Sequence, residues 1–274
     1  MNFEELARQT AQELFDGTAV IFLGAGASMG DDSERADGKG VPGSSALTKA
    51  IANRFGIELK YDADGNLLNA LRPIASLAVK ERDESTVKKY VIDQIRRRCG
   101  VPLKAHMALA SVNPHTIITT NYDDLYETAA REAGQHLEKV VRPDQLPRLP
   151  QYCPRLLKLH GDLEAPDRIV LTGADYRKWQ REAGGFKDKV VATLQESVCI
   201  FVGYGVGDET LHDILNIIEG NLGDSSLITL RARARSGRGA GRRVGGHGRV
   251  RQRRRDRVLR ARGQGIPDPW TSAV

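Results

Sequence analysis

Cysteine is scarce in this sequence, which has only three among 274 residues, at Cys99, Cys153 and Cys199. They are far apart and form no C-x-x-C pair, which excludes a disulfide framework and zinc-ribbon spacing. Long hydrophobic runs are also missing, because no apolar stretch approaches the roughly 18 residues of a membrane-spanning helix. The acidic, helix-like start MNFEELARQT differs from a signal peptide. We therefore expect a cytoplasmic protein with neither membrane contact nor zinc.

Two common catalytic signatures are absent as well. No G-K-[ST] follows a glycine cluster, as it does in a P-loop, and the G-x-S-x-G elbow of serine hydrolases does not occur. What is present is a 40% apolar composition, which suffices for a sizeable core. Apolar runs of strand length alternate with segments of helical periodicity. This alternation predicts a doubly wound, parallel α/β sheet.

The net charge of +6 is distributed very unevenly. Residues 231–274 contain 14 arginines, no lysine and two aspartates, so this tail carries +12 and the preceding 230 residues carry −6. Its arginine and glycine density and its lack of apolar periodicity exclude a packed core there. Three interpretations stay open: a disordered solvated tail, an arm that contacts nucleic acid, and the out-of-frame product of a GC-rich gene.

Within residues 1–230, periodicity and turn residues predict the individual elements. We expect an inserted, highly charged helical module at about 66–99, outside the alternating pattern. Ser44 or Ser45 is the expected N-cap of the second helix, and Asp208 or Thr210 that of the last. The predicted strands are 19–23, 116–120, 156–159, 168–171, 198–202 and 226–230; the other predicted helices begin near residues 3, 44, 102, 125, 176, 186 and 210.

The most informative pattern is a polar motif directly after each of three apolar runs. AVIFL leads into GAGAS at 24–28, HTIITT into NYD at 121–123, and RLLKL into HGD at 160–162. Ligands of open parallel sheets bind beyond the carboxyl ends of the strands, so the three motifs can converge on one crevice. Glycines let backbone N–H groups approach a pyrophosphate, while the other two motifs offer an amide, carboxylates and an imidazole. Together they indicate a nucleotide whose sugar is the site of reaction.

Each motif also has a purely structural interpretation. The glycines at 24–28 can form a plain strand-to-helix turn, and Asn121 or Asp123 can simply cap the following helix. A lone histidine such as His160 is more often structural than catalytic. The other histidines lack a comparable context, and we expect no functional role for any of them: His106, His115, His136, His212 and His247.

A fourth strand end, FVGYGVGD at 201–208, either closes over the adenosine half of a dinucleotide or forms a plain loop. Taken in order, GAGAS, TTNYDD, KLHGD and FVGYGVGD make about residues 18–220 resemble the sirtuin-like (silent information regulator type) family. The resemblance is greatest to its bacterial branch of NAD-hydrolysing antiphage defence proteins. It implies a Rossmann-like sheet and NAD as the substrate.

The resemblance also implies roles for individual residues. Asn121, Asp123 and His160 would be catalytic, with His160 as the base and Asn121 orienting water or the ribose. The nucleotide would be held by the strand-end motifs and by a proline element at 41–42. The implied NAD-binding residues are Gly24, Ala25, Gly26, Ser28, Pro42, Thr120, Gly203, Tyr204 and Asp208.

Two departures from the family pattern refine the expected activity. The zinc module of protein-deacylating sirtuins needs two C-x-x-C pairs, which this chain lacks, and Gly205 replaces a common serine or threonine. We therefore expect NAD cleavage by water, giving nicotinamide and ADP-ribose. The alternatives are a module that senses NAD or ADP-ribose without turnover, and an NAD-dependent protein deacylase.

The resemblance finally suggests an organisation and partners. Residues 1–230 would form the catalytic domain, followed by the tail at 231–274. Because uncontrolled NAD hydrolysis would kill the host, we expect control by assembly. The expected partners are further copies of the chain and a defence protein that is an ATPase or guided by nucleic acid.

Overall fold

The computed structural model describes residues 3–29, 40–148, 150, 153–204, 209–222 and 230–232. Their strands form one six-stranded sheet of order β3-β4-β2-β1-β5-β6 in which every pairing is parallel. This confirms the predicted doubly wound α/β class. The strands are β1 (Ala19–Leu23), β2 (Thr116–Thr119), β3 (Glu138–Val140), β4 (Arg155–Lys158), β5 (Val198–Val202) and β6 (Leu230–Ala232).

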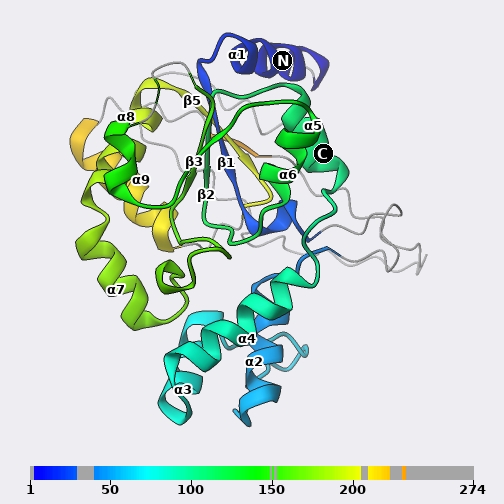
Figure 1. The fold of residues 1–274 in the computed structure, drawn as a ribbon, viewed down its shortest axis with the longest axis vertical. Coiled ribbons are helices and arrows are strands. Elements are labelled where there is room, and N and C mark those ends of the chain that lie inside the picture. Colours follow the sequence, from blue (N-terminus) through cyan, green and yellow to red (C-terminus); the bar gives the residue numbers. More distant parts are fainter. Residues whose placement is uncertain are drawn as a thin grey trace, which may run out of the picture.

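Helices cover both faces of the sheet (Figure 1). Side chains of β1 alternate between two cores, with Val20 and Phe22 in one and Ile21 and Leu23 in the other. Successive strand residues point to opposite faces, so a strand buried on both sides needs a continuous apolar run. One face packs against α1 (Phe3–Phe15), α5 (Lys104–Ser111) and α6 (Leu125–Glu132), the other against α7 (Gly173–Glu182), α8 (Gly184–Glu196) and α9 (Glu209–Leu222).

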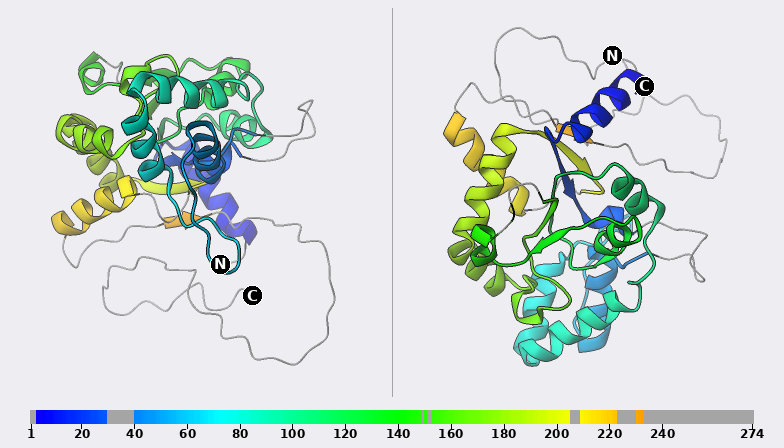
Figure 2. Two further views of the ribbon diagram at one scale, coloured as in Figure 1. Left: turned by 90° about the horizontal axis from the view of Figure 1, so that it is seen from below. Right: turned by 45° about the horizontal axis from the view of Figure 1, so that its top comes forward.

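Three further helices form a lobe beyond the carboxyl ends of the strands, at the end of the sheet opposite α1 (Figures 1 and 2). They share a third core, in which Ile51, Ile74 and Val91 pack with Leu125 and Ile169 of the main body. Two of them lie in the stretch predicted as an inserted helical module, and the first packs with them. The lobe consists of α2 (Ser44–Phe55), α3 (Leu71–Glu81) and α4 (Glu84–Arg96).

The predicted strand at 168–171 is wrong. The chain forms a short 3-10 helix, η3 (Pro166–Arg168), followed by an extended loop whose Val170 N–H donates to the His160 carbonyl at 3.0 Å. Ile169 packs in the lobe core and Val170 in the sheet core, both buried. The apolar pattern therefore reflects a loop that fills two cores, since burial alone produces the composition of a buried strand.

Smaller differences concern short elements and caps. Strand β3 was missed because three residues, EKV, carry too little periodicity, and η2 (Pro143–Arg148) interrupts the expected extended connection. Gly43, not Ser44 or Ser45, is the N-cap of α2 and makes no side-chain bond. Asp208, residues 223–229 and the tail from residue 233 lie outside the described residues. No helix in the described part of the chain is both long and apolar enough to span a membrane.

Candidate active site

The strand order fixes where a ligand can bind. The chain runs from β1 to β2 and β4 on one side and returns to β5 on the other, so β1 is flanked by β2 and β5. In open α/β sheets, ligands bind in a crevice beyond the carboxyl ends of the strands at such a switch point, so a ligand crevice is expected here. The GAGAS segment follows β1 directly at this point, and the 3-10 helix η1 (Ala25–Ala27) begins there. All four predicted motifs therefore start from the carboxyl edge of the sheet.

The glycines after β1 allow close approach to the loop after β5. Gly24 N–H donates to the Val202 carbonyl at 2.9 Å and Gly26 N–H to the Gly203 carbonyl at 2.7 Å. A Cβ on Gly24 would lie 2.6 Å from the Tyr204 Cα, and one on Gly26 would lie 2.7 Å from the Gly203 oxygen. These contacts require glycine whether or not a phosphate binds. Gly26 is nevertheless exposed, as is Ala25, so η1 presents its backbone to solvent.

The loop after β5 is equally constrained. Gly203 has φ of +66°, and a Cβ there would lie 2.0 Å from the Ala27 nitrogen. The Tyr204 ring stands edge-on to Phe22, with centroids 5.0 Å apart. The structure thus brings Gly203 and Tyr204 against GAGAS, as the interpretation of a shared pocket requires.

The proline element joins the same edge. Val41 N–H donates to the Ser28 carbonyl at 2.7 Å, which places Val41 and Pro42 next to the end of GAGAS. The intervening residues 30–39 lie outside the described part of the chain. Val41 is buried in the lobe core and Pro42 is half-buried, so the element connects the end of GAGAS to the lobe.

Asn121 is anchored between β1 and β2. Its backbone N–H donates to Thr119 Oγ1 at 3.0 Å, and that hydroxyl donates to the Leu23 carbonyl at 2.7 Å. Its side-chain Nδ2 faces Ser28 Oγ at 3.4 Å. Asn121 is only 7% exposed, and its Oδ1 has no hydrogen-bond partner among the described residues. A buried acceptor without a partner is costly, so this oxygen is suited to a ligand donor. Thr120 beside it is half-buried.

Neither Asn121 nor Asp123 is the N-cap of α6, which is Asp124 and makes no side-chain cap bond. Asp123 nevertheless contacts the start of the helix, because its Oδ1 accepts the Leu125 N–H at 3.3 Å. The Asn121 side chain is directed at Ser28 instead. One oxygen of Asp123 thus stabilises the helix start, and Asp123 is buried.

His160 lies beside Asn121 in the register of the sheet. Thr119 of β2 pairs with Lys158 of β4, and Asn121 and His160 each lie two residues further along the chain. The His160 Nε2 lies 2.8 Å from Thr210 Oγ1, so Thr210 binds the histidine instead of capping α9. The ring is buried and meets Trp179 edge-on, with centroids 5.4 Å apart. A histidine with a purely structural role would make the same contacts, so the role of His160 as a base rests on its chemistry and its place in the motif.

Residues 115–242 match the family model of the SIR2-like domain. The chain is therefore similar to sirtuin-like proteins. An NAD(+) hydrolase ThsA from Enterococcus faecium is 27% identical over 224 residues, which cover 80% of this chain and 43% of that protein. The ThsA of Bacillus cereus (strain MSX-D12) is 26% identical over 216 residues, covering 78% of this chain and 42% of the relative.

A third relative points the same way over a shorter stretch. Defense-associated sirtuin 2 of Bacillus subtilis is 27% identical over 114 residues, covering 40% of this chain and 11% of that protein. The chain spans about two fifths of the length of the two hydrolases it matches.

Sequence reasoning missed Lys158, the last residue of β4. It is fully buried, and its Nζ contacts the Asp123 carbonyl at 2.6 Å, Glu127 at 2.8 Å and Asp162 at 2.6 Å. Burial alone would lower the pKa of Lys158, but the two carboxylates hold it above its usual value. The same ammonium keeps the pKa of Asp162 low against the effect of burial. Lys158 therefore ties the NYD loop to the HGD motif, and a lysine inside the run RLLKL was its signal.

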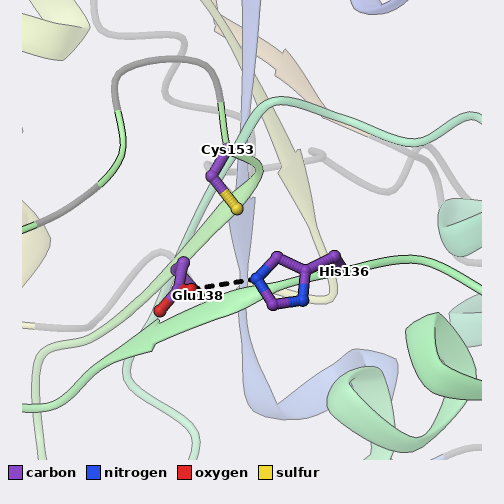
Figure 3. A group of neighbouring side chains, drawn as sticks. All are labelled: His136, Glu138 and Cys153. Atoms are coloured by element: carbon purple, nitrogen blue, oxygen red, sulfur yellow. Dashed lines mark hydrogen bonds and ion pairs between the residues drawn. The ribbon is translucent and has the colours of Figure 1, made fainter.

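Two other features lie apart from the contact between Asn121 and Ser28. A cavity of about 330 Å³ borders Trp179 and the two chain neighbours of His160, Leu159 and Gly161, but neither Asn121 nor Ser28 lines it. At the amino ends of β3 and β4, three possible metal-ligating atoms lie within 4.8 Å of one another (Figure 3). That group consists of His136, Glu138 and Cys153.

Two of the three side chains in Figure 3 already interact with each other. The His136 side chain is 80% exposed, and its Nε2 lies 3.0 Å from Glu138 Oε1, which accounts for the approach of these two residues without a metal. Three partly exposed donors are also one short of the four ligands of a closed structural zinc site. The group lies at the edge of the sheet opposite the crevice.

Proposed function

We propose that this sirtuin-like chain hydrolyses NAD to nicotinamide and ADP-ribose, and that it does so in defence against phage. The observation that carries the proposal is the buried Oδ1 of Asn121, which faces no described donor at the carboxyl edge of the sheet. The names of its relatives, NAD(+) hydrolase and defence-associated sirtuin, support the activity and its use. Residues 1–230 would form the catalytic domain.

The proposed reaction needs three roles at this edge. Asn121 Oδ1 would accept a hydrogen bond from the attacking water or a ribose hydroxyl, because its Nδ2 is already directed at Ser28. Water would attack the ribose carbon as the bond to nicotinamide breaks, and the bonding electrons would leave with the nicotinamide. His160 would accept the proton that water loses, as a general base near neutral pH. The Asp123 carboxylate would offset the positive charge that develops on the ribose.

The nucleotide would lie across the edge between β1 and β5. Gly24, Ala25, Gly26 and Ser28 would face its pyrophosphate at the exposed start of η1. The N–H groups of Gly24, Gly26 and Ser28 already donate within the protein, so the Ser28 hydroxyl and the Ala25 N–H would make the polar contacts. The remaining contacts would come from the flanking loops. These residues are Pro42, Thr120, Gly203, Tyr204 and Asp208.

Incubation of the purified chain with NAD tests the proposal. Chromatography should show nicotinamide and ADP-ribose in equal amounts without any peptide. His160→Ala should lower the rate at least about 100-fold, the range for loss of a general base. Asn121→Ala should lower it about 100-fold, the cost of misplaced reacting groups. The matched control His136→Ala, at an exposed site far from the crevice, should leave the rate unchanged. An O-acyl-ADP-ribose formed only with an acetyl-lysine peptide would instead establish a deacylase.

Assembly and partners stay predictions. Light scattering of the purified chain should give a mass that is a multiple of its 30.1 kDa if it forms the predicted homo-oligomer. A single species at the monomer mass would contradict it. Co-purification from a bacterial host carrying the neighbouring genes would test the ATPase or nucleic-acid-guided partner.

A further inference from the structure

Among the described residues, His106 is the one buried histidine that belongs to none of the four motifs and yet contacts one of them. It lies in the first turn of α5, is 0% exposed, and places its Nε2 3.3 Å from Ser28 Oγ. His106 thus contacts a predicted site residue, and a separation of 78 residues in the sequence concealed this contact. A buried imidazole needs partners for its ring nitrogens, so these contacts determine its state.

The hydrogen bonds of His106 fix its tautomer. Its Nδ1 lies 3.3 Å from the backbone N–H of Leu103, which can only donate. Nδ1 must therefore carry the lone pair, and the neutral ring has its proton on Nε2. A cationic ring would bring two donors face to face at Nδ1. It follows that Nε2–H donates to Ser28 Oγ and that His106 remains neutral.

The Ser28 hydroxyl then receives two hydrogen bonds. Nε2–H of His106 and Nδ2–H of Asn121, at 3.3 Å and 3.4 Å, occupy both of its lone pairs. The hydroxyl proton of Ser28 must point elsewhere, away from both donors. The same arrangement holds the Asn121 amide with Nδ2 toward Ser28, so that Oδ1 faces away from it.

We propose that His106 is a positioning residue for the nucleotide site. It holds the Ser28 hydroxyl as a double acceptor, so that the Ser28 proton is directed at an anionic oxygen of the substrate pyrophosphate. Through Ser28 it also fixes the orientation of Asn121. The inference rests on the proposed function, because the substrate that these groups position is NAD.

Two substitutions separate positioning from stability. The side-chain amide of His106→Gln reaches the place of Nε2 and can donate to Ser28. His106→Asn places its amide at Nδ1, where it keeps the Leu103 contact but cannot reach Ser28. We expect His106→Asn to lower kcat/KM for NAD about 10- to 100-fold, since small misplacements in a site cost up to about 100-fold. His106→Gln should stay within about fivefold of the parent, and the exposed-site control His136→Asn should match the parent.

A double-mutant cycle with Ser28→Ala gives a readout that a purely structural role would not affect. If His106 acts through Ser28, His106→Asn should have no further effect on kcat/KM in the Ser28→Ala background. Equal losses in His106→Asn and His106→Gln, or a full additional loss in the double variant, would overturn the positioning role.

The same variants distinguish failure of this inference from failure of the proposed function. If the parent binds NAD without cleaving it, the proposal of NAD hydrolysis is wrong. The same double-mutant cycle can then be measured as NAD-binding affinity by calorimetry. Weaker NAD binding by His106→Asn, absent in the Ser28→Ala background, would support positioning; unchanged binding would overturn it. If the parent neither binds nor cleaves NAD, both proposals are wrong.

Discussion

Replacement of Lys158 by methionine should destabilise the protein far more than the same change at a partly exposed lysine. Methionine keeps most of the side-chain volume but removes the ammonium. Glu127 and Asp162 then lose the cation that lies 2.8 Å and 2.6 Å from them, and the carbonyls of Tyr122 and Asp123 lose a donor. The side chain is 0% exposed, so water cannot replace the lost contacts.

The expected size follows from this burial. Removal of one partner from a buried ion pair costs about 3–5 kcal/mol, because an uncompensated charge stays in the interior. Lys139 provides a matched control, since it pairs with the same Asp162 at 3.4 Å and with Glu164 at 2.7 Å but is 28% exposed. Exposed pairs contribute at most about 1 kcal/mol, so Lys139→Met should cost that or less.

Urea unfolding followed by circular dichroism measures both variants against the parent. The deficit of Lys158→Met should also shrink as the pH falls from 7 towards 4. Without the ammonium, burial raises the folded-state pKa of Asp162 from its lowered value, and the pKa of Glu127, which burial already raises, increases further. The destabilisation is therefore fully present at pH values above these folded-state pKa values. It decreases as the pH falls and the carboxyl groups take up protons. A Lys158→Met protein within about 0.5 kcal/mol of the parent at pH 7 would refute the reasoning, because typical surface substitutions have effects of that size.

Three further predictions concern the frame of the site. Gly203→Ala should cost about 1–3 kcal/mol more than Gly134→Ala in urea unfolding, because both have positive φ but only Gly203 meets backbone within 3 Å; equal costs would contradict the close approach. Asp175 has its pKa lowered, against the effect of burial, by Lys88 and by backbone bonds, so its stabilisation is present above about pH 4 and lost as pH falls. The stability deficit of Asp175→Asn should therefore narrow below that pH, and a constant deficit would disprove the link. Asp83→Ala should cost about 1 kcal/mol through loss of the α4 N-cap, and the exposed Lys89→Ala should cost nothing.

Much of the sheet could be predicted because its strands pack against apolar cores on both faces. Ala19–Leu23 and Val198–Val202 are continuous apolar runs, and the structure has strands with those bounds. The stretch 168–171 has a similar composition and failed, because a loop that fills two cores needs the same apolar side chains. The apolar pattern of a segment shows that the segment is buried, but it does not show whether the segment pairs with a neighbouring strand.

The candidate site could be located from sequence but its supporting contacts could not. Motifs after strands converge because parallel strands share one carboxyl edge, which brings Asn121 beside Ser28. His106 and Lys158 reach the same edge through tertiary contacts with residues 78 and 35 positions away. No local pattern encodes such contacts. A lysine within an apolar strand was the only visible sign of the second, and the first had none.

The proposed chemistry depends above all on Asn121 and His160 forming a site that cleaves NAD with water. The most direct measurement is the release of nicotinamide and ADP-ribose from NAD in the absence of any peptide, for the parent and for His160→Ala. We expect equal amounts of the two products from the parent and at least about a 100-fold slower release from the variant. Release by His160→Ala at the parent rate, or no ADP-ribose from the parent at enzyme concentrations equal to NAD, would contradict this chemistry.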